Sequence, residues 1–116
     1  MFSIANIKYP SLQKSLQNSI NYIVKEHPDS LRQVILFGSC ARGDETADSD
    51  IDLCLVFADS EEITSRRMLI YKGYLRCIDE YNRDLVFCKQ THLLSQECLL
   101  YKLINRDGKV LVDFST

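Results

Sequence analysis

A glycine–serine pair and two nearby aspartates are the residues of this 116-residue chain best suited to chemistry. Gly38 and Ser39 directly follow the apolar run 34–37, which is typical of a buried strand. A turn of small residues leaving a strand exposes backbone N–H groups, and such groups can bind phosphate oxygens. The Ser39 hydroxyl adds a further donor, so this turn is a candidate phosphate-binding site.

Asp50 and Asp52 follow Ser39 after ten intervening residues and enclose one apolar residue, Ile51. They stand at the start of the run 51–57, which predicts a second strand, and strand side chains alternate between faces with a period of two. The two carboxylates are therefore expected on one face, where they repel each other unless a cation lies between them. Mg²⁺ is the expected cation because it prefers hard oxygen ligands and substrate phosphates.

A third carboxylate for such a site is Asp84, which precedes another strand-like run at 85–88. In two-metal chemistry one ion activates the attacking oxygen and the other stabilises the leaving pyrophosphate. We expect Asp50 and Asp52 to hold the two ions. Asp84 would ligate the ion nearer the acceptor and help to remove the acceptor's proton.

The charged residues around this signature allow more than one role. Arg42 either steadies a nucleotide triphosphate or pairs with Asp44, Asp48 or a metal-site carboxylate, and the sequence favours neither. Asp48 and Ser49 are expected to shape the loop through bonds to nearby backbone N–H groups. The basic residues further along the chain are expected to be solvated rather than to face a triphosphate; they are Lys72, Arg76 and Arg83.

These residues resemble the signature of the minimal nucleotidyltransferases of the DNA polymerase beta superfamily. The Gly-Ser-x-Ala-Arg-Gly form is present at 38–43, and the Ser-Asp-x-Asp-Leu form at 49–53. The resemblance implies a polymerase-beta-like nucleotidyltransferase fold with ATP as substrate. It also implies that Gly38, Ser39 and Arg42 bind the nucleotide. Asp50, Asp52 and Asp84 would be the catalytic and metal-binding residues.

The spacing between Ser39 and Asp50 is similar to that of antitoxin members encoded beside HEPN ribonuclease toxins. This resemblance implies Mg²⁺-dependent transfer of AMP from ATP to a tyrosine of the partner toxin, which silences the toxin, in a hetero-oligomeric complex. Two alternatives stay open. The chain could inhibit its partner by binding alone, or it could transfer a nucleotide to a small molecule such as an aminoglycoside.

Composition sets bounds on the function. A length of 116 residues and 46% apolar content predict one domain over 1–116. The net charge of −2 and pI near 5.6 argue against direct nucleic-acid binding, which ordinarily uses a basic surface. Five cysteines without a Cys-x-x-Cys pair argue against zinc and a disulfide framework. No apolar run approaches the roughly 18 residues of a membrane span, and we expect a cytoplasmic protein.

The remaining patterns predict the elements that position the site. Helices are expected after Pro10 as far as Pro28, for one turn after Gly38, from a cap at Asp59 and Ser60, and from Thr91 to about Leu103. The third helix is expected to bury a stripe formed by Ile63, Ile70, Tyr71, Tyr74, Leu75 and Ile78. Strands are expected at 34–37, 51–57, 85–87 and 110–112. This order predicts an α+β (α/β-like) domain with a small mixed sheet flanked by helices.

Overall fold

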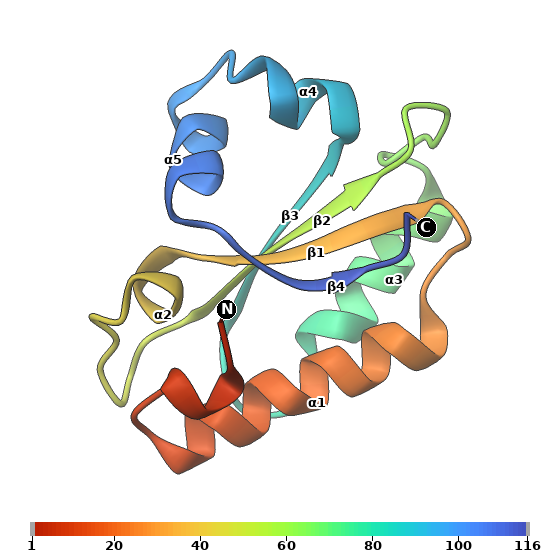
Figure 1. The fold of residues 1–116 in the computed structure, drawn as a ribbon. Coiled ribbons are helices and arrows are strands. Elements are labelled where there is room, and N and C mark those ends of the chain that lie inside the picture. Colours follow the sequence, from red (N-terminus) through yellow and green to blue (C-terminus); the bar gives the residue numbers. More distant parts are fainter. Residues whose placement is uncertain (1, 116) are drawn as a thin grey trace.

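A computed structural model describes residues 2–115, in which four strands form one sheet with helices on both faces (Figure 1). The predicted α+β domain with a mixed sheet is confirmed. Along the chain the elements are η1 (Ile4–Asn6), α1 (Pro10–Glu26), β1 (Leu31–Phe37), α2 (Gly38–Arg42), β2 (Ile51–Phe57), α3 (Arg66–Arg76), β3 (Arg83–Lys89), α4 (Gln90–Ser95), α5 (Leu99–Asp107) and β4 (Lys109–Asp113).

The strand order is β3-β2-β1-β4, so the two central strands flank the signature. β1 pairs antiparallel with β2 and with β4, whereas β2 and β3 run parallel. Because β1 ends where β2 and β3 begin, the turn after β1 and the first residues of β2 and β3 meet at one end of the sheet. In the β2–β3 register Asp52 lies opposite Asp84.

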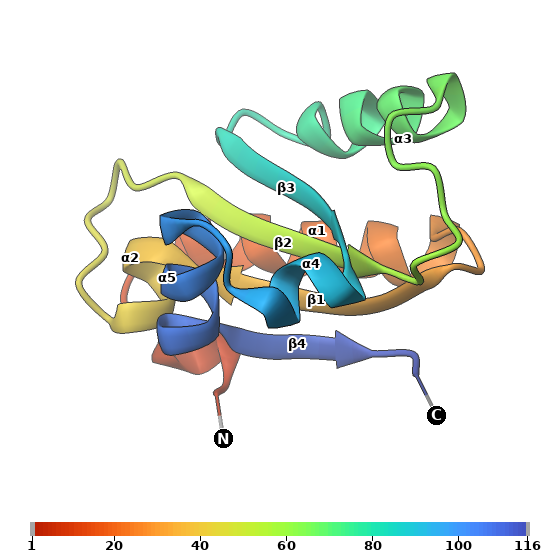
Figure 2. The same cartoon turned by 90° about the horizontal axis from the view of Figure 1, so that it is seen from above.

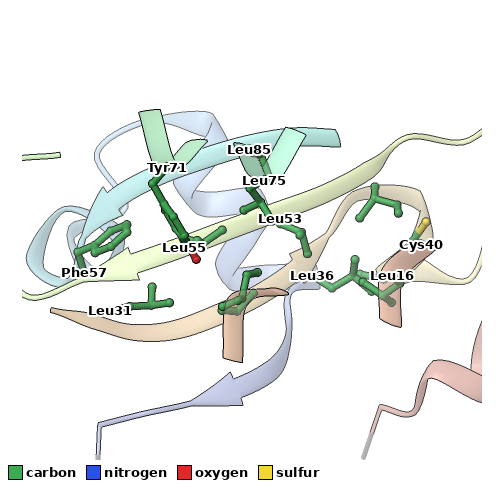
Figure 3. Close-up of a cluster of buried hydrophobic side chains, with 14 of the residues drawn as sticks. Leu16, Leu31, Leu36, Cys40, Leu53, Leu55, Phe57, Tyr71, Leu75 and Leu85 are labelled. Carbon is green, nitrogen blue, oxygen red and sulfur yellow. The ribbon is translucent and has the colours of Figure 1, made fainter. Parts of the chain in front are cut away.

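Helices cover the two faces unequally (Figures 1 and 2). α1 and α3 lie on one face, and α4 and α5 lie on the other. β2 is covered on both faces, which explains its nearly continuous apolar sequence. The larger core, part of which is drawn in Figure 3, joins α1 and α3 to the sheet through Leu12, Leu16, Leu36, Leu53, Leu55, Met68 and Leu75. The smaller core lies under α4 and α5 and contains Ile35, Cys54, Val56, Cys88, Leu93 and Ile104.

The third helix begins later than its sequence predicts. Asp59 and Ser60 do not cap it; the cap is Ser65, whose Oγ accepts a hydrogen bond from the Met68 N–H at 3.3 Å. Asp59 instead accepts hydrogen bonds from the backbone N–H and the hydroxyl of Thr91, each at 3.1 Å. Asp59, expected to cap α3, therefore connects the segment before α3 to the start of α4.

The buried side of α3 also differs from the predicted one. Met68, Tyr71 and Leu75 pack against the sheet, while Ile70 and Tyr74 are exposed, so the predicted stripe was wrong at these two positions. Ile63 and Ile78 pack against the core as expected but lie outside the helix. The helix predicted from Thr91 to about Leu103 is likewise divided in two. Its interruption is at Gln96, which adopts a left-handed conformation with φ 52° and ends α4. Among residues 2–115 no helix has the length and apolar character needed to cross a membrane.

Candidate active site

Gly38 brings the end of β1 directly against Asp52, the second residue of β2. Its φ of 73° lies in the left-handed region that favours glycine. A Cβ at this position would lie 2.9 Å from Asp52 Cγ and would overlap Asp52 Oδ2. The absence of a side chain therefore lets the Gly38 backbone approach the carboxylate closely. Gly38 and Ser39 form the first turn of α2 at this point.

The Asp52 carboxylate is the most perturbed acid of the signature. Burial, followed by the negative charges of Asp84 and Asp50, raises its pKa from 3.8 to about 6. Asp84 is also close enough to share a hydrogen bond with Asp52. The structure thus brings together all three predicted carboxylates, with Asp52 and Asp84 as neighbours across parallel strands.

Hydrogen bonds fix the loop that carries Asp50. The backbone N–H of Thr46 donates to Ser49 Oγ at 2.8 Å, and Ser39 Oγ donates to Ser49 Oγ at 3.3 Å. The Cys40 thiol donates to the Asp50 carbonyl oxygen at 3.6 Å. The predicted loop-shaping role is confirmed for Ser49. Asp48 is exposed, and within residues 2–115 its side chain makes no hydrogen bond of this kind.

Arg42 forms ion pairs with neighbouring carboxylates. Its Nε lies 3.2 Å from Asp44 Oδ2, and its Nη1 lies 3.8 Å from Asp107 Oδ2 at the end of α5. The positive charge of Arg42 also acts to lower the pKa of Asp52, against the larger effects of burial and the other carboxylates. The structure therefore favours structural pairing for Arg42 and still places its charge within reach of the site.

The donor set suits a hard cation. The three carboxylates could supply oxygen ligands, and a bound cation would offset both the burial and the mutual repulsion that raise the pKa of Asp52. Over the described range 2–115, no three His, Cys, Asp or Glu side chains converge closely enough to form a ready-made metal site. The residues are thus adjacent, but their side chains are not arranged around a common point.

The sequence pattern of the nucleotidyltransferase domain family matches residues 18–107, which include the turn, the paired aspartates and Asp84. This chain belongs to that family. It is a nucleotidyltransferase, and the carboxylates at the end of the sheet lie within the region that defines it.

Individual relatives agree with this assignment. A Methanocaldococcus jannaschii protein named as a protein adenylyltransferase is 27% identical over 97 residues, which cover 77% of this chain and 97% of that protein. The solved toxin–antitoxin with AMP-PNP contains a chain that is 27% identical, with a TM-score of 0.56, covering 84% of this chain and 73% of that one. The fold is also similar to that of a Sulfolobus solfataricus nucleotidyltransferase structure, with a TM-score of 0.58 at 19% identity over 89% and 81% of the two chains.

A pocket of about 420 Å³ opens beside the carboxylates of this nucleotidyltransferase. It lies between the end of α3 and the start of β3, and its lining includes Asp50, Arg76, Cys77, Asn82 and Asp84. The lining therefore includes Asp84, the carboxylate that the sequence predicts to be nearer the acceptor. Arg76, the last residue of α3, is exposed and lines this pocket.

Arg83 was expected to be solvated, and this expectation was wrong. The side chain is buried, its Nη1 lies 2.8 Å from Asp79 Oδ1, and its Nε donates to Ser19 Oγ of α1 at 2.6 Å. The Arg83 guanidinium holds the pKa of Asp79 well below its usual range. Arg83 thereby fastens the first residue of β3 to α1 and fixes the strand position that presents Asp84.

Glu45 is a buried residue that the sequence did not single out. Neither of its carboxylate oxygens has a hydrogen-bond partner within 2–115, and Lys8 Nζ lies 3.8 Å from Oε1. Lys8 also donates to the Gly43 carbonyl oxygen at 2.8 Å. The N-terminal segment is therefore joined to the signature loop. Glu45 is one of five acidic residues between 44 and 52, and nothing in the sequence distinguishes it from the others as a buried residue.

Proposed function

We propose that this nucleotidyltransferase is an antitoxin enzyme that transfers AMP from ATP, with Mg²⁺, to a tyrosine of a partner toxin of the HEPN type. The observation that carries the proposal is the adjacency of Asp52 and Asp84 across parallel strands, with Asp50 beside them and the Gly38 turn against Asp52. The relative named as a protein adenylyltransferase and the similarity to a toxin–antitoxin solved with an ATP analogue support it.

Each site residue has a specific role in this proposal. Gly38 and Ser39 bind the triphosphate, Arg42 contributes its positive charge from its pairing position, and Asp50, Asp52 and Asp84 would hold two Mg²⁺ ions. When bound, the ions would supply positive charge at the attacking and leaving oxygens. The crowding that raises the pKa of Asp52 makes these carboxylates a favourable place for such charge.

The transfer exchanges one bond at phosphorus for another. A bond forms between the tyrosine oxygen and the α-phosphorus, the bond from the α-phosphorus to the bridging oxygen breaks, and pyrophosphate leaves with that electron pair. Asp84 accepts the phenolic proton because it lines the pocket on the acceptor side. The reaction is placed in the cytoplasm, where ATP is available and where reducing conditions would keep the five cysteines free.

Intact-mass spectrometry of the protein encoded beside this chain tests the proposal. After incubation with the wild type, ATP and Mg²⁺, the partner should gain the mass of one or more AMP units, and EDTA should prevent the gain. Asp52→Ala should abolish transfer, while Asp48→Ala, a matched change at an exposed acid of the same loop, should preserve it. Transfer by Asp52→Ala at the wild-type rate would contradict the proposed metal site.

Growth assays separate this function from the two alternatives. If the protein with Asp50→Ala and Asp52→Ala together protects cells from the partner as well as the wild type does, inhibition is by binding. If the partner gains no mass but expression confers aminoglycoside resistance, the acceptor is a small molecule. Loss of protection in the double variant, together with loss of the AMP mass gain, would support the antitoxin enzyme.

A further inference from the structure

The outward side of α3 is a second apolar surface of this helix. Met68, Tyr71 and Leu75 already pack against the sheet. The exposed fractions of three large side chains on the other side are high, at 58% for Leu69, 47% for Ile70 and 65% for Tyr74. Helical spacing of three and four residues places one exposed stripe along the helix. This stripe, called the α3 face below, consists of Arg66, Leu69, Ile70, Gly73, Tyr74 and Cys77.

A glycine lies in the middle of the α3 face. Glycine in a helix interior is about 1 kcal/mol less favourable than alanine. Around Gly73, no atom lies within 4 Å of where a Cβ would stand, so packing within the described chain gives no reason for glycine here. Between Leu69 or Ile70 on one side and Tyr74 on the other, the missing side chain leaves room for a close approach by another backbone.

The charge of α3 favours an acidic partner. The helix carries four basic residues and no acidic one, although the whole chain has a net charge of −2. Arg67 pairs with Glu61 and Lys72 lies over the Phe87 ring, which leaves Arg66 and Arg76 at the two ends of the helix to attract a partner. Two copies of α3 facing each other would bring together two sets of positive charges, which disfavours self-association through this surface. Complementary charge would instead attract a different protein with acidic residues around its contact surface.

The α3 face is continuous with the active site. Arg76 and Cys77, at the end of α3, line the same pocket as Asp50 and Asp84. Figure 2 shows α3 lying alongside the β3 edge of the sheet. A protein bound along α3 would therefore extend directly to the carboxylate that faces the acceptor.

We propose that the α3 face is the docking surface for the acceptor protein, which binds through an apolar helix face flanked by acidic side chains. Leu69, Ile70 and Tyr74 supply the apolar contact, Gly73 allows the close approach of the helices, and the basic residues orient the partner. The inference rests on the proposed function in one respect, namely that the acceptor is a protein.

The test combines Leu69→Glu with Tyr74→Glu in the full chain, with Leu94→Glu as a matched control. Leu94 is 72% exposed and lies on α4, on the opposite face of the sheet. Isothermal titration measures binding of the protein encoded beside this chain, and a separate titration measures binding of AMP-PNP with Mg²⁺. We expect the double variant to bind the partner about 100-fold more weakly, since two central apolar contacts are lost. Its affinity for AMP-PNP should be unchanged, and the control should bind both as the wild type does.

Kinetics and charge provide two further readouts. In AMP transfer, the double variant should have a raised KM for the acceptor with an unchanged kcat, because docking is affected and chemistry is not. Arg66→Glu should weaken partner binding, and added NaCl should weaken binding by the wild type. Arg66 lies on the α3 face and outside the pocket beside the carboxylates.

The outcomes distinguish this inference from the proposed function. Wild-type binding and transfer by the double variant would overturn the docking surface and leave the transferase function standing. Weakened binding by the double variant, even if the wild type moves no AMP, would support the docking surface alone. The inference is also overturned if the wild type does not bind the partner, or if the wild type alone is a dimer that the double variant converts to a monomer.

Discussion

Replacing Asp52 with asparagine should make the protein more stable while it abolishes nucleotidyl transfer. The Asp52 carboxylate is half-buried and lies beside Asp84 and Asp50, whose negative charges disfavour its ionised form. Asparagine has nearly the same shape and no charge, so the repulsion disappears. The same change removes an oxygen donor that the proposed metal site requires.

The size of the effect follows from the pKa of Asp52, which is raised from 3.8 to about 6. Such a difference corresponds to about 3 kcal/mol of unfavourable interaction in the ionised folded protein. Solvent screening of a half-buried group reduces this to roughly 1–2 kcal/mol. Below pH 3.8 the group is protonated in both the folded and the unfolded state, so the penalty is absent. It grows as the pH rises and is complete above pH about 6.

Thermal unfolding in EDTA across this pH range provides the assay. At pH 7.5 the melting temperature of Asp52→Asn should exceed that of the wild type by roughly 4–8 °C, and the difference should shrink as the pH falls towards 4. Asp48→Asn removes the same charge from an exposed position and should give no such gain. Added Mg²⁺ should stabilise the wild type and not Asp52→Asn. A variant that is less stable than the wild type at pH 7.5 would refute the crowding of charges at this site.

Three further predictions concern backbone, ion pair and thiols. Gly38→Ala should abolish transfer because its Cβ would overlap Asp52. Gly43 has a φ of 86° and open space around it, so Gly43→Ala should lower the free energy of unfolding by about 1 kcal/mol and retain activity. Arg83→Leu should lower the free energy of unfolding by about 3 kcal/mol, as urea denaturation would show, because Asp79 loses its partner; an unchanged midpoint would contradict this. Two of the five thiols are exposed, so a thiol reagent should modify two rapidly and the other three only after unfolding.

The local elements of the fold follow from short-range physics and could be predicted from the sequence. Pro10 fixes the start of α1, apolar runs mark the strands, and Gly38 interrupts β1 at the residue where α2 begins. The signature loop was also predictable, because its chemistry is concentrated in one stretch of the chain. Within that stretch Asp50 and Asp52 needed only the alternation of strand side chains to be placed together.

Elements with more than one possible start were harder to predict. Asp59, Ser60 and Ser65 are all suitable helix caps, and the choice of Ser65 depends on Asp59 being engaged by Thr91 of α4. Because Asp59 and Thr91 are 32 residues apart, no local pattern reports their contact. Packing of Met68, Tyr71 and Leu75 against the sheet likewise leaves Ile70 and Tyr74 facing outwards on the α3 face.

The sequence alone determined the type of chemistry, since the turn at Gly38 and the paired aspartates lie within one short stretch. Only the tertiary structure decided that Asp84 lies beside Asp52. Its distance from Asp52 depends on the parallel register of β2 and β3, which is set by packing and by the buried Arg83 at the start of β3. Local propensities act over a few residues. The pKa of Asp52 is instead raised by burial and by the charge of Asp84, 32 positions away, and only the folded sheet produces both.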